Sequence, residues 1–241
     1  MRQVILDTET TGLEPRHGHK IIEIGCVELL ERKHTGNHFQ RYINPNREID
    51  AGAEQVHGIS SAFLSDKPEF LKVVDDFLSY VKGAELVIHN APFDIGFLNH
   101  ELNLATEKSG KNYGKMSDYC TVLDTLVVAR KMHPGQKNSL DALCKRYFVD
   151  NSNRQLHGAL LDSQILADVY LAMTGGQVNM FAAPGESRIS SAEEKIRRVK
   201  TGGDSLRVIR ANDEELQAHE SRLDAIDKAS DGSLWRNPNS E

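Results

Sequence analysis

Two acidic residues lie one residue apart where an apolar run ends near the N-terminus. In VILDTETTGLE, residues 4–14, the apolar residues lead directly into Asp7 and Glu9. If the strand continues through them, both side chains project from the same face, because residues i and i+2 of a strand do so. Neighbouring carboxylates repel each other and are costly to remove from water. The pair is therefore either a solvated strand end or part of a functional site.

A third acid occupies a position where the sequence period calls for an apolar residue. In the helix expected over 158–173, the core face carries Ile165, Leu166, Val169 and Met173, and this face extends back to Asp162. A buried carboxylate is unfavourable unless a cation or hydrogen bonds compensate its charge. His157 precedes this helix and can approach Asp162 only from the loop that Gly158 bends. An imidazole there suits a general base.

Other titratable residues have weaker contexts. Asp94 lies in the first turn of a helix, where an acid ordinarily complements the helix dipole. Asp124 and Asp141 are expected to be structural or solvated, and His89 is expected to be a surface or core residue. The role of His57, in the segment VHGI, stays open.

The expected elements that position these residues form a mixed sheet with helices on both faces. Strands are predicted at 3–8, 21–30, 36–45, 85–90 and 120–124. Helices are predicted at 68–83, 91–104, 125–132, 139–147 and 158–173, with a loop over 106–117. Three consecutive strands with short connections favour an antiparallel meander, and the later strand–helix alternation favours an α/β fold.

Composition sets further limits on the class of protein. The chain has 241 residues, of which 39% are hydrophobic and 27% charged, as in globular proteins. No secretory leader or membrane-spanning segment is predicted, and three widely spaced cysteines favour a reducing, cytoplasmic setting. The net charge of −6 argues against tight autonomous binding to nucleic acid through a wide basic face.

The C-terminal quarter differs in composition from the rest. We expect a domain at 1–175, a linker at 176–205 and a flexible C-terminal segment at 206–241. In the last segment, DEELQAHESRLDAI offers only a narrow apolar stripe: Leu216, Leu223 and Ile226. Such a stripe rarely folds alone, so a binding partner is the expected support.

The acidic residues occur in motifs that resemble those of the DEDDh 3′→5′ exonucleases. The matching motifs are D-x-E with Asp7 and Glu9, HNAPFD with Asp94, and H-x4-D with His157 and Asp162. This resemblance implies a ribonuclease H-like fold with a five-stranded mixed sheet. It also implies that Asp7, Glu9, Asp94 and Asp162 hold two divalent cations, Mg²⁺ or Mn²⁺.

The same resemblance implies roles in the reaction for individual residues. His157 would deprotonate the attacking water, and a nucleoside 5′-monophosphate would leave the 3′ end. The substrate would be bound by Asp7, Glu9, His57 and Asp162.

Longer segments are similar to the proofreading exonuclease subunits of bacterial replicative DNA polymerases. They include GHKIIEIG, ELVIHN, NSLDALC, LHGALLD, LAMTGG and, near the C-terminus, DEELQAHESRLD and SLWR. The similarity implies a DNA 3′ end as substrate and a cytoplasmic enzyme whose C-terminal segment binds the polymerase catalytic subunit. Leu234 and Trp235 are the expected anchors. A small accessory subunit would be a further partner.

The segment 177–181 allows two interpretations. It is either the start of a disordered linker or a peptide that resembles those bound by the bacterial sliding clamp. The matching positions are Gln177 and the aliphatic–aromatic pair Met180 and Phe181.

Two alternative functions stay open from the sequence. The first is a DEDDh exoribonuclease that trims RNA 3′ ends, for which a long linked tail has no obvious use. The second is a non-catalytic adaptor that binds DNA or a polymerase, which the presence of all four acids and the histidine disfavours.

Overall fold

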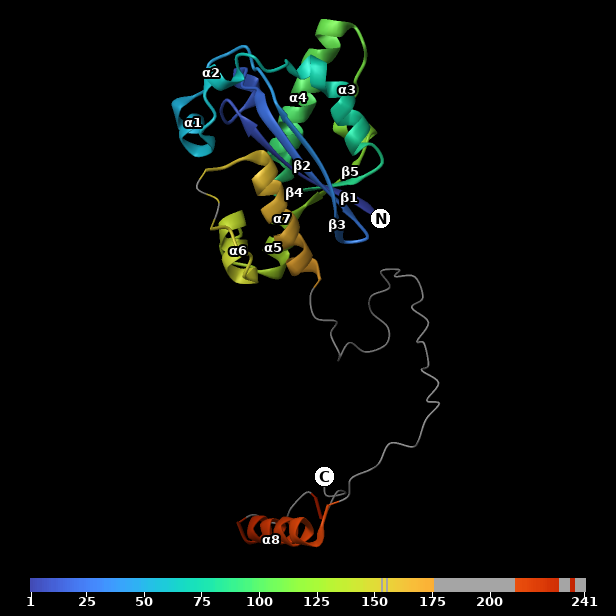
Figure 1. The fold of residues 1–241 in the computed structure, drawn as a ribbon, viewed down its shortest axis with the longest axis vertical. Helices are drawn as coiled ribbons and strands as arrows, with labels where there is room; N and C mark the ends of the chain where they lie inside the picture. Colours follow the sequence, from blue (N-terminus) through green and yellow to red (C-terminus); the bar gives the residue numbers. More distant parts are fainter. Residues whose placement is uncertain (153, 155, 176–210, 230–234, 237–241) are drawn as a thin grey trace. The chain divides into compact units, whose positions relative to one another are not determined.

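The computed structural model describes residues 1–152, 154, 156–175, 211–229 and 235–236 (Figure 1). The chain divides into two compact units, Met1–Phe181 and Ala182–Glu241. Among the described residues, no helix is both long and apolar enough to cross a membrane.

The first unit is built on a five-stranded sheet with the order β3-β2-β1-β4-β5. The strands are β1 (Arg2–Thr10), β2 (Ile21–Leu30), β3 (Lys33–Tyr42), β4 (Glu85–Ile88) and β5 (Thr121–Asp124). β1, β2 and β3 pair antiparallel, whereas β4 pairs parallel with both β1 and β5. The predicted mixed sheet and its antiparallel meander are therefore confirmed.

Helices cover both faces of this sheet, as Figure 1 shows. The helices of the first unit are α1 (Ala51–His57), α2 (Ser61–Leu64), α3 (Phe70–Val81), α4 (Ala91–Ser109), α5 (Thr125–Met132), α6 (Leu140–Tyr147) and α7 (Ala159–Thr174). Short 3₁₀ turns occur at Pro15–His17 and Met116–Asp118. α3 and α4 pack on one face, and α7, supported by α5 and α6, packs on the other.

The alternation of side chains along β1 divides that strand between the two faces. Val4 and Leu6 belong to the core under α3 and α4, whereas Ile5 belongs to the core under α7. Continuing the alternation places Thr8 on the α4 side and both Asp7 and Glu9 on the α7 side. The end of β1 thus presents polar groups to both helical layers.

The third strand is displaced from its predicted boundaries. The third strand spans 33–42 rather than 36–45, because the hairpin turns at Glu31 and Arg32, both with positive φ. No Asn or Gly marks this turn. Arg32 supports it by donating to Thr174 Oγ1 and the Leu171 carbonyl of α7.

The loop expected over 106–117 begins later than predicted, and two short helices were missed. α4 continues to Ser109 and ends at Gly110, whose φ of 73° suits a glycine C-cap. The 3₁₀ turn at Met116–Asp118 overlaps the end of the predicted loop. α1 and α2 escaped prediction because they are too short to show an apolar period.

The second unit contains α8 (Asp213–Ala229), in the region where the sequence showed only a narrow apolar stripe. Asn212 and Glu215 form reciprocal side-chain to backbone hydrogen bonds at its start, a capping box. Of the helix's residues only Leu223 is buried. The described residues do not include Leu234 or the segment Gln177–Phe181, which contains Met180.

Candidate active site

The two acids of β1 lie at its carboxyl end, facing α7. The register places Asp7 opposite Gly25 and Glu9 opposite Glu23 of β2. Glu9 is buried and Asp7 is partly buried, so the solvated-strand-end interpretation is wrong for Glu9. The strand continues to Thr10, which meets the condition under which both side chains share one face.

Asp94 approaches from the other layer. It lies in the first turn of α4, is buried, and accepts a hydrogen bond from Thr8 Oγ1 at 2.7 Å. Since Thr8 projects toward α4, this bond connects the β1 motif to the α4 motif. The position suits the helix dipole, as the sequence suggested, and the acid is in addition buried and bonded to the β1 motif.

Close backbone packing places Asp162. A Cβ added to Gly25 would lie 2.2 Å from backbone atoms of Ala159 and Leu160, so only glycine allows α7 to come this near to β2. Ser163 Oγ donates to the Gly25 carbonyl at 2.9 Å. Asp162, one turn into α7, is buried as its place in the apolar period predicted.

His157 lies on the loop before α7, as its convergence with Asp162 requires. Its backbone N–H donates to the Val56 carbonyl at 3.1 Å, and Gly158 is the N-cap residue of α7. The Nδ1 atom is 3.3 Å from Asp162 Oδ2. Ligand atoms of Glu9, His157 and Asp162 all lie within 4.8 Å of one another.

Burial and mutual repulsion disfavour ionisation of these acids. Burial, followed by repulsion from Asp94, Glu9 and Asp162, raises the pKa of Asp7 well above its usual range. Burial and the Asp162 charge raise the pKa of Glu9 to about 8, and burial raises the pKa of Asp94 to about 7. Raised pKa values of this kind mean that a nearby positive charge would stabilise the ionised acids.

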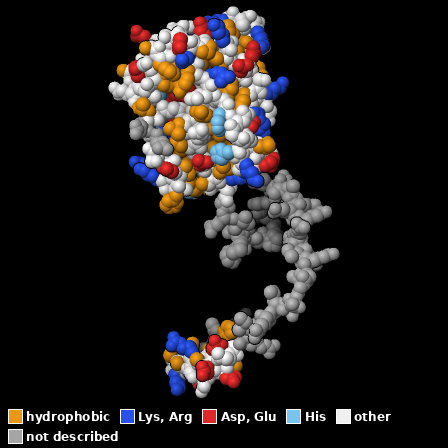
Figure 2. Space-filling view, viewed as in Figure 1, with side chains coloured by type: hydrophobic (Ala, Val, Ile, Leu, Met, Phe, Trp, Pro, Cys, Tyr) orange, Lys and Arg blue, Asp and Glu red, His pale blue; other side chains and the backbone are white. Residues whose placement is uncertain are grey.

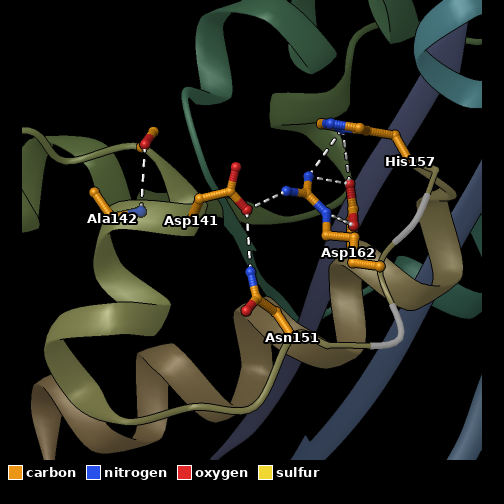
Figure 3. Close-up of polar contacts among 7 residues, drawn as sticks. Asp141, Ala142, Asn151, His157 and Asp162 are labelled. Carbon is orange, nitrogen blue, oxygen red and sulfur yellow. Dashed lines mark hydrogen bonds and ion pairs between the residues drawn. The ribbon is translucent and has the colours of Figure 1, made fainter.

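Arg154, which no sequence pattern indicated, brings a cation to this cluster. Arg154 Nε is 2.5 Å from Asp162 Oδ1, and Arg154 Nη2 is 2.6 Å from Oδ2 (Figure 3). Arg154 Nη1 is also 2.6 Å from Asp141 Oδ1, so Asp141 is ion-paired rather than merely solvated. Burial opposes the charge of Arg154, but these carboxylates raise its pKa above the ordinary value.

The acids open into a cleft of about 640 Å³. Its lining combines the acid cluster with polar and basic side chains: Asp7, Thr8, Glu9, His89, Asn90, Arg130, Gln136, Asn138, Ser139, Asp141, Arg154, His157 and Asp162, with Leu126 and Leu140. Asp94 is not part of this lining. Figure 2 shows Lys and Arg side chains interspersed with acidic and apolar ones on the face in view.

A second cleft of about 480 Å³ shares Thr8 and Glu9 with the first and is more apolar. Leu13, Val56, His57 and Phe93 contribute to its lining, together with Glu9. His57 is buried and its Nδ1 accepts the Ile59 N–H at 3.0 Å. Its Nε2 has no hydrogen-bond partner among the described residues.

His89 and Asp124 make structural contacts: His89 contacts Thr125 Oγ1, and Asp124 caps α5.

The donor set fits hard divalent cations. The cluster offers carboxylate oxygens with a single imidazole and no thiolate, which suits Mg²⁺ or Mn²⁺ better than zinc. The three acids with raised pKa values, Asp7, Glu9 and Asp94, would gain a compensating charge from such ions. The arrangement can therefore support metal-dependent hydrolysis of a phosphodiester.

Comparisons with known proteins agree with this chemistry. A family model described as Exonuclease matches residues 4–170. Exonuclease X, solved with 5′-overhanging duplex DNA, is 28% identical with a TM-score of 0.55, over 72% of this chain and 91% of that one. The nuclease domain of a DEDDh 3′-exonuclease bound to rAMP has the same fold, with 19% identity, a TM-score of 0.60 and coverage of 72% and 92%. Fold and site define a divalent-metal-dependent 3′→5′ exonuclease.

Whole-chain relatives give the narrower family. The DNA polymerase III subunit epsilon of Salmonella typhimurium is 55% identical over 98% of this chain and 97% of its own length. The proteins of the same name from Escherichia coli and Haemophilus influenzae are 54% and 48% identical, over 98% and 97% of this chain and 97% and 94% of their own lengths. The chain belongs to the family of DNA polymerase III epsilon subunits, the proofreading exonucleases.

Proposed function

We propose that Asp7, Glu9, Asp94 and Asp162 hold two divalent cations, Mg²⁺ or Mn²⁺, at the 3′-terminal phosphodiester of DNA. The observation that carries this assignment is the convergence of Glu9, His157 and Asp162 within 4.8 Å at the end of β1. When bound, the cations supply Lewis-acid activation of the water and the phosphate.

In this proposal the protein's own residues orient the reactants and move the proton. The ring of His157 takes a proton from the attacking water at Nδ1, the nitrogen that faces Asp162. Its side chain is about half exposed, with a relative exposure of 45%, so the proton can pass to solvent. The 3′-terminal nucleotide leaves as a 5′-monophosphate.

The apolar cleft beside Glu9 is the proposed seat of the terminal base. Val56 and Phe93 provide apolar surface, and His57 provides a buried Nε2 without a partner among the described residues. A base can enter this cleft only when it is unstacked and unpaired, as at a frayed 3′ end. We therefore assign substrate binding to His57 in addition to Asp7, Glu9 and Asp162.

Interaction with a polymerase is proposed for the second unit. The relatives are named as subunits of DNA polymerase III, and their similarity covers the C-terminal segment. Leu216 and Ile226 of α8 are exposed, and so is Trp235, which lies after the helix; such apolar side chains suit a partner surface. The same proposal includes a contact with the sliding clamp through Gln177, Met180 and Phe181. It also includes a small accessory subunit as a partner and a cytoplasmic location.

Hydrolysis of a 3′-labelled single-stranded DNA by the full-length protein tests the assignment. Asp7→Ala and Asp162→Ala should abolish release of 5′-mononucleotides, whereas Asp76→Ala, at an exposed position of α3, should not. An RNA strand of the same sequence distinguishes an exoribonuclease. Full activity in EDTA, or preference for the RNA strand, would contradict the proposal.

A further inference from the structure

Arg154 already binds both oxygens of the Asp162 carboxylate (Figure 3). The guanidinium nitrogens Nε and Nη2 lie 2.5 Å from Oδ1 and 2.6 Å from Oδ2. Both side chains are more than nine-tenths buried, with 8% and 4% relative exposure. A bidentate pair of this kind is among the stronger polar contacts in proteins. A cation that also needs Asp162 must therefore compete with Arg154.

A second carboxylate gives Arg154 an alternative partner. Asp141, in the first turn of α6, receives Arg154 Nη1 at 2.6 Å. It also accepts a hydrogen bond from Asn151 Nδ2 at 3.2 Å, so its position is fixed independently of Asp162. Asp141 is about half exposed and is not among the four acids assigned to the cations. Arg154 can thus release Asp162 without becoming an unpaired buried charge.

The Arg154 guanidinium also forms a hydrogen bond with His157. Arg154 Nη2 lies 2.9 Å from His157 Nδ1. A guanidinium has donors but no acceptor, so Nδ1 must be the acceptor in this contact. Its lone pair is the one that the proposed mechanism needs for the water proton. One side chain therefore engages both a proposed metal ligand and the proposed base.

We propose that Arg154 is an exchangeable internal cation that competes with divalent metal ions for Asp162. Arg154 lowers the affinity of the site for metal, and metal binding transfers the guanidinium to Asp141 and frees His157 Nδ1. This inference rests on the proposed metal role of the four acids. The physical reason for the exchange is that Asp162 is too deeply buried to stand without a cation.

Titration of the full-length protein with Mn²⁺ by calorimetry tests the competition. R154Q removes the charge and the two-pronged contact, so Mn²⁺ should bind roughly tenfold or more tightly. R154K keeps the charge but cannot form the same fork, so its affinity should fall between wild type and R154Q. R130Q is the matched control, because Arg130 lines the same cleft with no contact to the acids among the described hydrogen bonds. It should bind Mn²⁺ as wild type does.

Equal Mn²⁺ affinity in R154Q and wild type would overturn the exchange, as would an equal gain in R130Q. Absence of Mn²⁺ binding to wild type would instead overturn the proposed metal site itself. If R154Q fails to fold, R154K and the following measurement decide. The Nε–H resonance of Arg154, assigned by its loss in R154K, should shift when Mg²⁺ is added. An unchanged Nε–H resonance, while the Asp162 amide shifts, would show that Arg154 stays in place.

Discussion

Glu23 Oε2 accepts a hydrogen bond from the backbone N–H of Ala159 at 3.1 Å, across 136 residues of sequence. Ala159 is the first residue of α7, and the N-cap residue Gly158 has no side chain to satisfy this group. The other oxygen, Oε1, accepts from Gln40 Nε2 at 2.8 Å. A residue of β2 therefore caps the helix that carries Asp162.

Loss of this cap should shift α7 and thereby reduce exonuclease activity. Glu23→Ala should lower stability by about 0.5–2 kcal/mol, the usual effect of losing a cap, and lower the exonuclease rate as Asp162 shifts. Glu23→Gln keeps an acceptor for Ala159 and should restore most of both. Thermal unfolding and single-turnover hydrolysis measure the two effects. Wild-type rates in Glu23→Ala would show that the cap does not position Asp162.

His157→Ala should slow the chemical step while leaving DNA binding intact. A general base contributes roughly 10²–10⁴-fold, so the single-turnover rate should fall within this range. His17→Ala, on an exposed turn, is the control. A single-turnover rate equal to that of wild type would assign the base to another group.

The stability of the metal-free protein should fall as the pH rises through the neutral range. The pKa of Glu9 is about 8 when folded, against an ordinary value of 4.5, so the folded state binds more protons between these values. The free energy of unfolding then decreases with pH by at most about 1.4 kcal/mol per unit for this group.

Glu9→Gln should flatten this dependence, because an amide does not titrate. Denaturant unfolding in EDTA at several pH values measures the slope. Glu14→Gln, at an exposed position, should leave it unchanged. Stability that rises between pH 5 and 8 in wild type would contradict the raised pKa.

The sequence indicated those site residues that interrupt the apolar periodicity of a helix or follow from its geometry. Asp162 stands where α7 needs an apolar residue, and the placement of His157 on a loop followed from helix geometry alone. Asp94 had an ordinary explanation at its helix start, and the motif resemblance gave it a role. Glu23 was missed, although an acid within the apolar segment IIEIG, residues 21–25, was a usable signal.

Arg154 could not have been found in the same way. Its partners Asp162 and Asp141 come from two helices, and no period or spacing connects a loop arginine to both. The hairpin at Glu31 and Arg32 was missed for a related reason. A distant contact, between Arg32 and the end of α7, stabilises a turn that local residue preference does not predict.

The clamp prediction concerns residues outside the described part of the chain. Gln177→Ala combined with Met180→Ala and Phe181→Ala should leave the exonuclease rate on single-stranded DNA unchanged. It should weaken assembly of polymerase, exonuclease and clamp, because a short tethered peptide acts through its effective concentration. Sizing of the purified mixture measures assembly. Equal clamp affinity in wild type and the triple variant would refute the contact.

Trp235 should be the main polymerase anchor in the described part of the second unit. Arg236 contacts Glu220, Asp224 and Asp227 of α8, and this holds the neighbouring Trp235 ring edge-on against His219 at 6.0 Å. The ring is nevertheless 76% exposed, so a large apolar group is held ready for a partner. Trp235→Ala should weaken binding to the polymerase catalytic subunit by about 2 kcal/mol or more, roughly 30-fold. Exonuclease activity should not change, and Gln217→Ala, an exposed change on the same helix, should leave binding intact. Calorimetry with the purified catalytic subunit decides, and equal affinities for wild type and Trp235→Ala would place the contact elsewhere in the chain.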